Sequence, residues 1–112
     1  MKKTKLGEFE ELVLLAVAAL QQDAYGVEIK RELEARLKGK LSVGSIQSAL
    51  KRMEEKGFLT SEFGEATAKR GGKRKRIYTT TSYARRVLVE MKDIRAGLWD
   101  SIPKLAHEMK LI

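Results

Sequence analysis

The chain has 112 residues, which predicts a single domain, and it contains no cysteine and one histidine, His107. These counts exclude disulfides, thiolate metal sites and histidine-rich metal centres, so we expect no metal and no cofactor. The formal net charge of +8, from 23 basic and 15 acidic side chains, indicates a polyanionic partner, either nucleic acid or an anionic membrane surface.

A membrane partner is the weaker of these two options. The longest apolar run, Leu12 to Leu20, has about half the length of a bilayer span. Three glutamates separate this run from the lysines near the start of the chain, a pattern that does not form a signal peptide. We therefore expect a soluble cytoplasmic protein without a membrane partner. The sequence also lacks nucleophile–base pairs, paired-acid spacing and a phosphate-binding loop, so we predict that it is not an enzyme.

The first predicted helix runs from Leu6 or Gly7 to about Leu20. Its apolar residues recur at helical spacing and extend almost all round the helix, so one small domain can hardly cover them. That pattern is the first indication of a dimer. A second helix is expected from Ala24 to Lys38, with Asp23 as its N-cap and Gly39 as its left-handed C-terminal residue.

Ser42 is expected to cap a third helix that runs from Val43 to Lys56 and ends at Gly57. At about 100° per residue, its apolar residues gather on one side and small or polar residues on the other. The polar side holds Gly44, Ser45, Ser48, Lys51, Arg52 and Glu55, with Gln47 at its flank. This segment alone is equally consistent with a helix that approaches a DNA groove and with an ordinary solvent-exposed helix.

Two segments rich in β-branched or aromatic residues, 58–63 and 77–81, predict a β-hairpin. The stretch from Lys69 to Arg76 holds six basic residues, no acid and the pair Gly71-Gly72. A basic run is often a solvated loop. Glycines in a tight turn, however, would present the flanking cations together.

The last predicted helix begins at Ser82, with Thr81 as its N-cap. From Ala84 to Ile112 its apolar residues alternate at spacings of three and four, which is a coiled-coil seam whose only polar member is Arg95. Pro103 is expected to break or kink this helix. Because the seam is longer than the small core can cover, it is the second indication of a dimer.

The order of helix, helix, helix, hairpin and long helix predicts a mainly α fold with a small β-hairpin. We expect a winged helix-turn-helix over residues 1–81 and a C-terminal dimerisation helix over residues 82–112. The third helix would enter the major groove of DNA, and the cations of the wing would neutralise phosphates beside it.

Three stretches of the chain resemble the PadR family of bacterial and archaeal transcriptional regulators: AYGVEI (24–29), LSVGSI (41–46) and ALKRMEEKGFL (49–59). The basic segment 70–75, followed by Tyr78, is similar to the family's wing and second strand. The resemblance spans about Leu6 to Leu88. It implies a homodimeric repressor on a roughly palindromic operator, often responsive to small, planar, hydrophobic effectors. Many members carry a Tyr-Pro pair where this chain has Gln47-Ser48.

Three sets of site residues follow from the pattern and the resemblance. The expected contacts to double-stranded DNA are Tyr25, Ser42, Ser45, Gln47, Ser48, Lys51, Arg52, Lys69, Arg70, Lys73, Arg74 and Lys75. The expected contacts to a small aromatic effector are Phe9, Val13, Arg95 and Trp99. The expected contacts of the homodimer are Leu14, Leu15, Leu88, Met91, Leu98, Ile102 and Leu105. The alternative is a winged-helix module for RNA or protein contacts, in which the basic loop binds polyanions without operator specificity.

Overall fold

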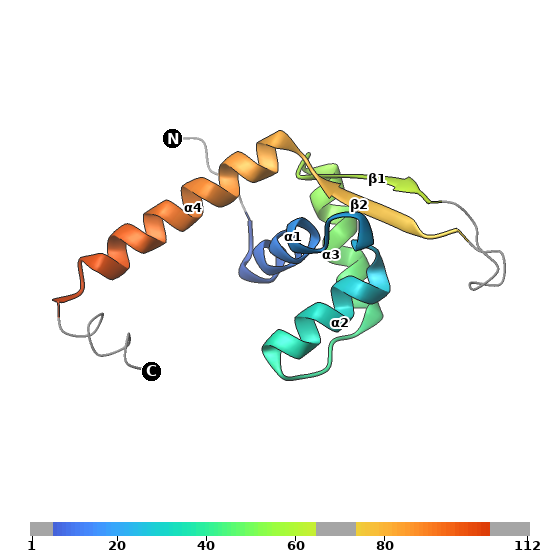
Figure 1. Cartoon of the computed structure of the whole chain (residues 1–112), viewed down its shortest axis with the longest axis horizontal. Helices are drawn as coiled ribbons and strands as arrows, with labels where there is room; N and C mark the ends of the chain where they lie inside the picture. The colour runs from blue at the N-terminus through green and yellow to red at the C-terminus, as the bar shows by residue number, and fades with distance from the viewer. Residues whose placement is uncertain (1–5, 65–73, 104–112) are drawn as a thin grey trace.

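The computed structural model describes residues 6–64 and 74–103, and helices dominate this part of the chain (Figure 1). In chain order the elements are α1 (Glu8–Leu20), the 3₁₀ helix η1 (Gln21–Asp23), α2 (Gly26–Leu37), α3 (Val43–Glu55), β1 (Leu59–Phe63), β2 (Arg76–Thr80) and α4 (Ser82–Asp100). The two strands form an antiparallel hairpin, with Leu59 opposite Thr80 and Phe63 opposite Arg76. The predicted mainly α fold with a small β-hairpin is confirmed.

The hydrophobic core lies where α1 packs against α2, α3 and β2. Its largest fully buried side chains include Leu14, Ile29, Leu50 and Phe58, and burying each of them contributes about 1.5–3 kcal/mol. The first turns of α4 complete this core, because Ala84 and Val87 are also buried.

Two predicted helix caps are present in the structure. The Ser42 hydroxyl accepts a hydrogen bond from the backbone N–H of Ser45 at 3.0 Å. The Thr81 hydroxyl accepts one from the backbone N–H of Ala84 at 3.1 Å. Each cap satisfies a backbone donor that the first turn of a helix leaves without an intrahelical partner. The starts of α3 and α4 were therefore predictable from local chemistry.

α1 is covered on only part of its circumference. Val13 and Leu14 are fully buried, whereas Leu15 is 46% exposed. Leu14 therefore belongs to the core of its own chain, which corrects the expectation that it contacts a partner. The helical spacing identified an apolar surface but could not show which part of it the chain itself covers.

α2 begins at Gly26 rather than at Ala24. The backbone N–H of Tyr78 donates to the carbonyl of Ala24 at 2.8 Å, and Tyr25 forms a β-bridge with Ile77. This pairing holds the backbone extended, so Tyr25 takes the N-cap position in place of Asp23. At the other end of α2, Lys38 adopts the left-handed conformation, with φ of 56°, where Gly39 was expected.

α4 extends beyond the rest of the domain as a projecting helix (Figure 1). Every residue from Lys92 to Asp100 is exposed. The radius of gyration is 16.5 Å, whereas a compact chain of this length has a value of about 13 Å. The distal half of α4 therefore buries little surface against the rest of its own chain.

α4 ends at Asp100, before Pro103. Proline lacks the N–H that a continuing helix needs, and its ring clashes with the carbonyl four residues upstream. The predicted seam is therefore interrupted before Ile102, and Leu105 lies outside the described residues. No helix in the described ranges is both long enough and apolar enough to cross a membrane.

Candidate nucleic-acid interface

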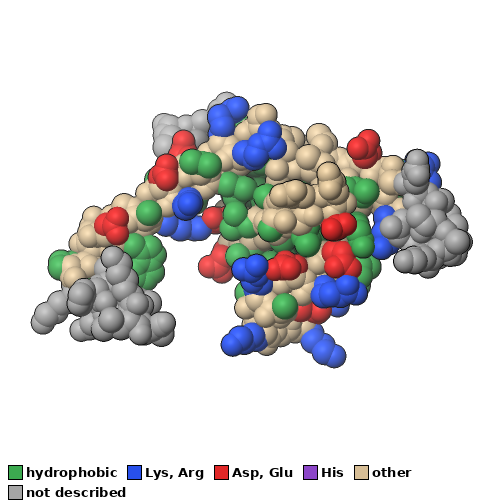
Figure 2. Space-filling model, in the orientation of Figure 1, with side chains coloured by type: hydrophobic (Ala, Val, Ile, Leu, Met, Phe, Trp, Pro, Cys, Tyr) green, Lys and Arg blue, Asp and Glu red, His purple; other side chains and the backbone are tan. Residues whose placement is uncertain are grey.

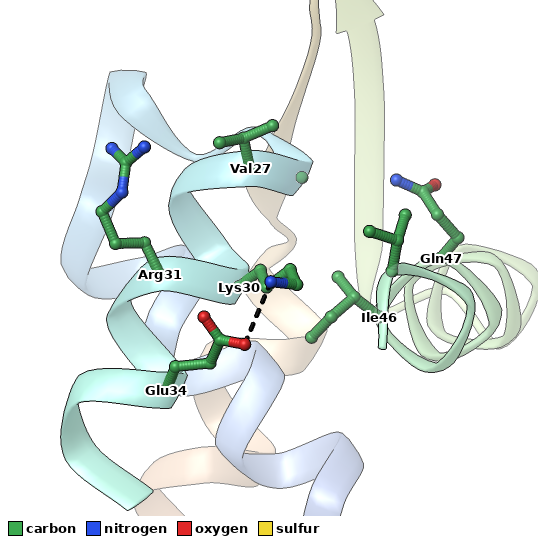
Figure 3. Close-up of a pocket in the computed structure, with 8 residues that line it drawn as sticks. Val27, Lys30, Arg31, Glu34, Ile46 and Gln47 are labelled. Atoms are coloured by element: carbon green, nitrogen blue, oxygen red, sulfur yellow. Dashed lines mark hydrogen bonds and ion pairs between the residues drawn. The ribbon is translucent and has the colours of Figure 1, made fainter. Parts of the chain in front are cut away.

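α2 and α3 form a helix-turn-helix, and Glu34 holds the turn between them. The Glu34 carboxylate accepts hydrogen bonds from the backbone N–H of Leu41 at 2.8 Å and from Lys30 Nζ at 3.0 Å. These two bonds lower the pKa of Glu34. Figure 3 shows the pair Lys30–Glu34 on the wall of a pocket between α2 and α3. The sequence pattern did not single out Glu34, because its bond to Leu41 forms only once the turn has folded.

α3 buries one face and exposes the other. Its residues Ile46, Ala49, Leu50 and Met53 are buried. On the opposite side, an exposed strip consists of Gly44, Gln47, Ser48 and Lys51. Their spacing of i, i+3, i+4 and i+7 places them in one row along the helix. A row of this kind, with a glycine near the start of the helix, suits the close approach of a recognition helix to base edges.

Two of the predicted contacts on α3 already have structural roles. The Ser45 hydroxyl donates to the carbonyl of Ser42 at 2.9 Å, so these two serines cap each other. Arg52 donates from Nε to Glu10 Oε2 at 2.8 Å, which ties α3 to α1. In contrast, no hydrogen bond or ion pair within the described residues engages the side chains of Gln47, Ser48 or Lys51. The predicted contacts on α3 whose side chains have no partner among the described residues therefore all lie in the exposed strip.

Glu10 holds two cations of α3 at once. Its carboxylate lies 2.8 Å from Arg52 Nε and 3.2 Å from Lys56 Nζ, and the residue is only 6% exposed. Burial by itself would raise the pKa of Glu10. The hydrogen bonds from Arg52, from the backbone of Gly7 and from Lys56 outweigh burial and lower this pKa to about 2. Glu10 was not a predicted site residue, because its partners are far away in the sequence.

We expect Glu10→Gln to lower stability at neutral pH and to lose this effect in acid. The folded-state pKa of about 2 lies below the ordinary value of 4.5. The charged carboxylate therefore stabilises the fold above pH 4.5, and this contribution disappears as the pH falls through about 2. Because Arg52 and Lys56 remain partly exposed, the cost at neutral pH should be about 1–2 kcal/mol.

Urea unfolding of both proteins at pH 7 and at pH 3 measures this difference. The control is Glu8→Gln, which removes a carboxylate from the same turn of α1 at an exposed position. A destabilisation by Glu10→Gln that is as large at pH 3 as at pH 7 would contradict the assignment.

The described cations of the hairpin, Arg74, Lys75 and Arg76, lie over two aromatic rings. Arg74 and Arg76 lie over the ring of Phe63, at 5.5 and 4.4 Å from its centroid. Arg76 also donates to the Ser61 hydroxyl at 2.8 Å, and this hydroxyl donates to Glu54 of α3 at 2.7 Å. The Ser61 hydroxyl therefore connects Arg76 of the hairpin to α3. Arg76 was not among the predicted contacts, although it closes the basic run.

Lys75, just before β2, lies over the ring of Tyr25. Its Nζ lies 3.6 Å from the centroid of the Tyr25 ring. Tyr25, Gln47 and Lys75 line one pocket, at which the start of α2, α3 and the hairpin meet. The N-terminus of α2 carries partial positive charge, and Lys75 adds a full charge, a combination that suits a phosphate group. Lys69, Arg70 and Lys73, the other expected wing contacts, lie outside the described residues.

A groove of about 500 Å³ lies between α1 and α4. Arg95 and Trp99 line it, as do Glu11 and Leu15. Arg95 donates to Glu11 at 2.6 Å, and this hydrogen bond raises the pKa of Arg95. The structure thus brings together two of the expected effector contacts.

The other two expected effector contacts need correction. Val13 is fully buried, and Phe9 packs half-buried against the core, so neither lines the groove. Both residues follow the apolar stripe of α1, which packs into its own domain. Among the described residues, no group of three or more His, Asp or Glu side chains could hold a metal ion.

The expected dimer contacts on α4 become more exposed toward its end. Leu88 and Met91 are half-buried, whereas Leu98 is 65% exposed. Ile102, beyond the end of the helix, is half-buried. Figure 2 shows hydrophobic side chains along the distal half of α4.

We expect Gly44→Ala to weaken DNA binding without lowering stability. A Cβ added at Gly44 meets nothing within 4 Å, and alanine is favoured over glycine inside a helix by up to about 1 kcal/mol. The added methyl group would stand in the exposed strip, where a close-fitting base pair would clash with it. We expect operator affinity to fall about tenfold, the cost of modest overpacking.

The matched control is Gly97→Ala, where an added Cβ also meets nothing within 4 Å but lies on α4. Thermal unfolding and fluorescence-anisotropy titration with duplex DNA measure the two properties separately. Unchanged DNA affinity of Gly44→Ala would show that this part of α3 does not approach the bases.

Comparison with known proteins identifies the family. Residues 14–90 match the transcriptional regulator PadR-like family. A PadR-like transcription factor from Bacteroides fragilis superposes with a TM-score of 0.72 at 19% identity, over 90% of this chain and 92% of that chain. A PadR-family regulator from Eggerthella lenta gives a TM-score of 0.63 at 28% identity, over 88% and 85%. A PadR-like regulator from Bacillus cereus gives 0.69 at 22% identity, over 87% and 89%.

No curated protein matches the chain significantly. The family match nevertheless covers α2, α3, both strands and the first half of α4, which are the elements that carry the candidate interface. The resemblance seen in the sequence is therefore confirmed. The chain belongs to the PadR-like family of transcriptional regulators, and its winged helix is a DNA-binding fold.

Proposed function

We propose that the protein is a homodimeric repressor that binds a roughly palindromic operator. The observation that carries this proposal is the meeting of Tyr25, Gln47 and Lys75 at one pocket beside the exposed strip of α3. Contacts from Tyr25 and Lys75 to phosphates would set the register of the protein on the duplex. The exposed strip would then reach base edges in the major groove.

The distal half of α4 supports a dimer. Ile94, Leu98 and Trp99 are 51%, 65% and 46% exposed, which is unusual for apolar side chains that lie close together on one helix. A second copy would remove them from water, and two-fold symmetry would place two α3 helices on matching half-sites. On this proposal residues 1–81 bind DNA and residues 82–112 dimerise.

Electrophoretic mobility shift on DNA from the promoter of the protein's own gene tests this function. We expect binding at 50 mM salt and an affinity loss of about 10³–10⁵-fold by 200 mM, as for six to ten phosphate contacts. Absence of a shift at low salt would overturn the proposal. Competition with single-stranded RNA tests the alternative, because an RNA that displaces the duplex equally well at matched salt excludes major-groove readout.

We also propose that a small, planar, hydrophobic effector releases the protein from DNA by occupying the groove between α1 and α4. Trp99 offers a flat surface for stacking, and the cations Lys92 and Arg95 on the same groove would attract an acidic group. Trp99 is the only tryptophan of the chain, so its fluorescence reports directly on this groove. A titration with flat aromatic acids that leaves both the fluorescence and the DNA affinity unchanged would contradict this role.

A further inference from the structure

Gln47, unlike Ser45 and Arg52 of the same helix, keeps its side chain available to a ligand. Ser45 is engaged in the cap, and Arg52 is engaged with Glu10. Within the described residues, the Gln47 amide has no hydrogen-bond partner, although it lies at the pocket beside Tyr25 and Lys75. An exposed amide at this position is available to a ligand.

Gly26 determines where this amide can lie. A Cβ added at Gly26 would stand 2.8 Å from Gln47 Nε2, which is closer than real Cβ contacts come. The missing side chain at Gly26 lets the Gln47 amide occupy its present position; because this amide is the far end of a flexible, exposed side chain, an alanine at 26 would displace the amide and leave the fold intact. Gly26 is a positioning residue for Gln47 and not itself a contact to DNA.

Apolar side chains accompany Gln47. Val27 and Val43 are 58% and 61% exposed, and both line the pocket between α2 and α3 that Gln47 also lines. Figure 3 shows Val27 and Gln47 on opposite walls of this pocket. Exposed valines at a DNA-binding surface match the methyl group that thymine presents in the major groove.

The chemistry of the amide distinguishes among the bases. A glutamine amide presents a donor and an acceptor side by side, and adenine presents the complementary acceptor N7 and donor N6 in the major groove. Guanine presents two acceptors at the same place, so the amide oxygen would face an oxygen. Lys51, in the same strip, has only donors, and it cannot make this distinction for adenine.

We propose that Gln47, positioned by Gly26, selects an adenine in each operator half-site. This inference rests on the proposed function, because it assumes that α3 reads the major groove. It goes further by naming the residue that determines specificity and the base pair that it selects. The exposed valines that line the same pocket would suit the methyl group of the thymine in that A·T pair.

Selection of binding sequences from a random duplex pool by the full-length protein tests the proposal. We expect the wild type to select a two-fold symmetric site with one adenine position in each half that Gln47→Ala no longer selects. Replacing that adenine by 7-deazaadenine, which removes the N7 acceptor, should weaken wild-type binding about tenfold, within the range for a good bidentate pair. The same replacement should leave the binding of Gln47→Ala unchanged.

Two further variants sharpen the test. Gly26→Ala should lose the same adenine preference while circular dichroism shows a folded protein, and adding Gln47→Ala to it should have little further effect. Glu55→Ala, at an exposed position of α3 outside the exposed strip, is the matched control and should keep the adenine preference.

The possible failures are distinguishable. If Gln47→Ala selects the same bases as the wild type, the proposal is overturned while the repressor function stands. If Gly26→Ala keeps the adenine preference, the positioning role of Gly26 is wrong. If the wild type selects no sequence at all, the proposed function fails, and this inference fails with it.

Discussion

Replacing Leu98 by aspartate is expected to convert the proposed dimer into a monomer and to weaken operator binding by roughly 10²–10⁴-fold. Leu98 is 65% exposed on the projecting part of α4, so the isolated chain tolerates a charge there. In the proposed dimer the same carboxylate would be buried against apolar side chains without a partner, which is costly. A monomer would then bind the half-sites one at a time, without the gain in affinity that a dimer obtains when its two subunits bind both half-sites together.

Light scattering gives the mass of the variant, and anisotropy titration gives its DNA affinity. The matched control is Gly97→Asp, one residue earlier, which adds the same charge where an added Cβ meets nothing within 4 Å. Its position is turned away from Leu98 by about 100°. A dimer mass that persists in Leu98→Asp would show that the second copy docks elsewhere.

Removing Arg74 and Lys75 together should flatten the salt dependence of DNA binding and leave the dimer intact. Each phosphate contact contributes about 0.9 to the slope of log affinity against log salt. Two contacts in each subunit of a dimer would lower the slope by up to about 3.6, equivalent to an affinity loss of up to about 4 × 10³-fold at 0.1 M salt. The variant Arg74→Ala/Lys75→Ala tests this in titrations at several salt concentrations.

The control variant is Arg36→Ala/Arg86→Ala, which removes the same charge from exposed positions on α2 and α4. It should change the slope much less, because neither arginine lines the pocket at the start of α2. A slope that is the same in the wing variant and the wild type would refute the role of the described wing cations. If the slope falls by only about 1.8, half of the value expected for a dimer, only one of the two wings contacts DNA.

Two adjacent carboxylates on α1, Glu10 and Glu11, connect the candidate DNA interface on α3 with the projecting helix α4. Glu10 binds Arg52 and Lys56 of α3, and Glu11 binds Arg95 of α4. One turn of α1 is therefore joined by ion pairs to both α3 and α4. Neither carboxylate was a predicted site residue, since partners 42 and 84 positions away cannot be identified from local spacing.

The sequence by itself determined the elements whose signals are local. Ser42 and Thr81 cap helices because their hydroxyls bond to backbone groups three residues ahead. Gly57 takes a positive φ of 85° after α3, as a helix-ending glycine often does. The two β-rich segments pair as a hairpin across the basic stretch. These features, together with the family motifs, were enough to identify the winged helix and the polar side of α3, with Gln47 placed only at the flank of that side.

Only the tertiary structure decided which side chains remain available to a ligand or a partner. Arg52 and Gln47 look alike as polar residues of one helix, but Glu10 engages Arg52, whereas the space beside Gly26 leaves the Gln47 amide open. Leu14 and Leu15 are neighbours in one apolar run, yet the first is buried and the second exposed. The start of α2 moved because Ala24 and Tyr25 pair with β2. In each case the deciding contact joins residues distant in sequence, and such contacts exist only after the chain has folded.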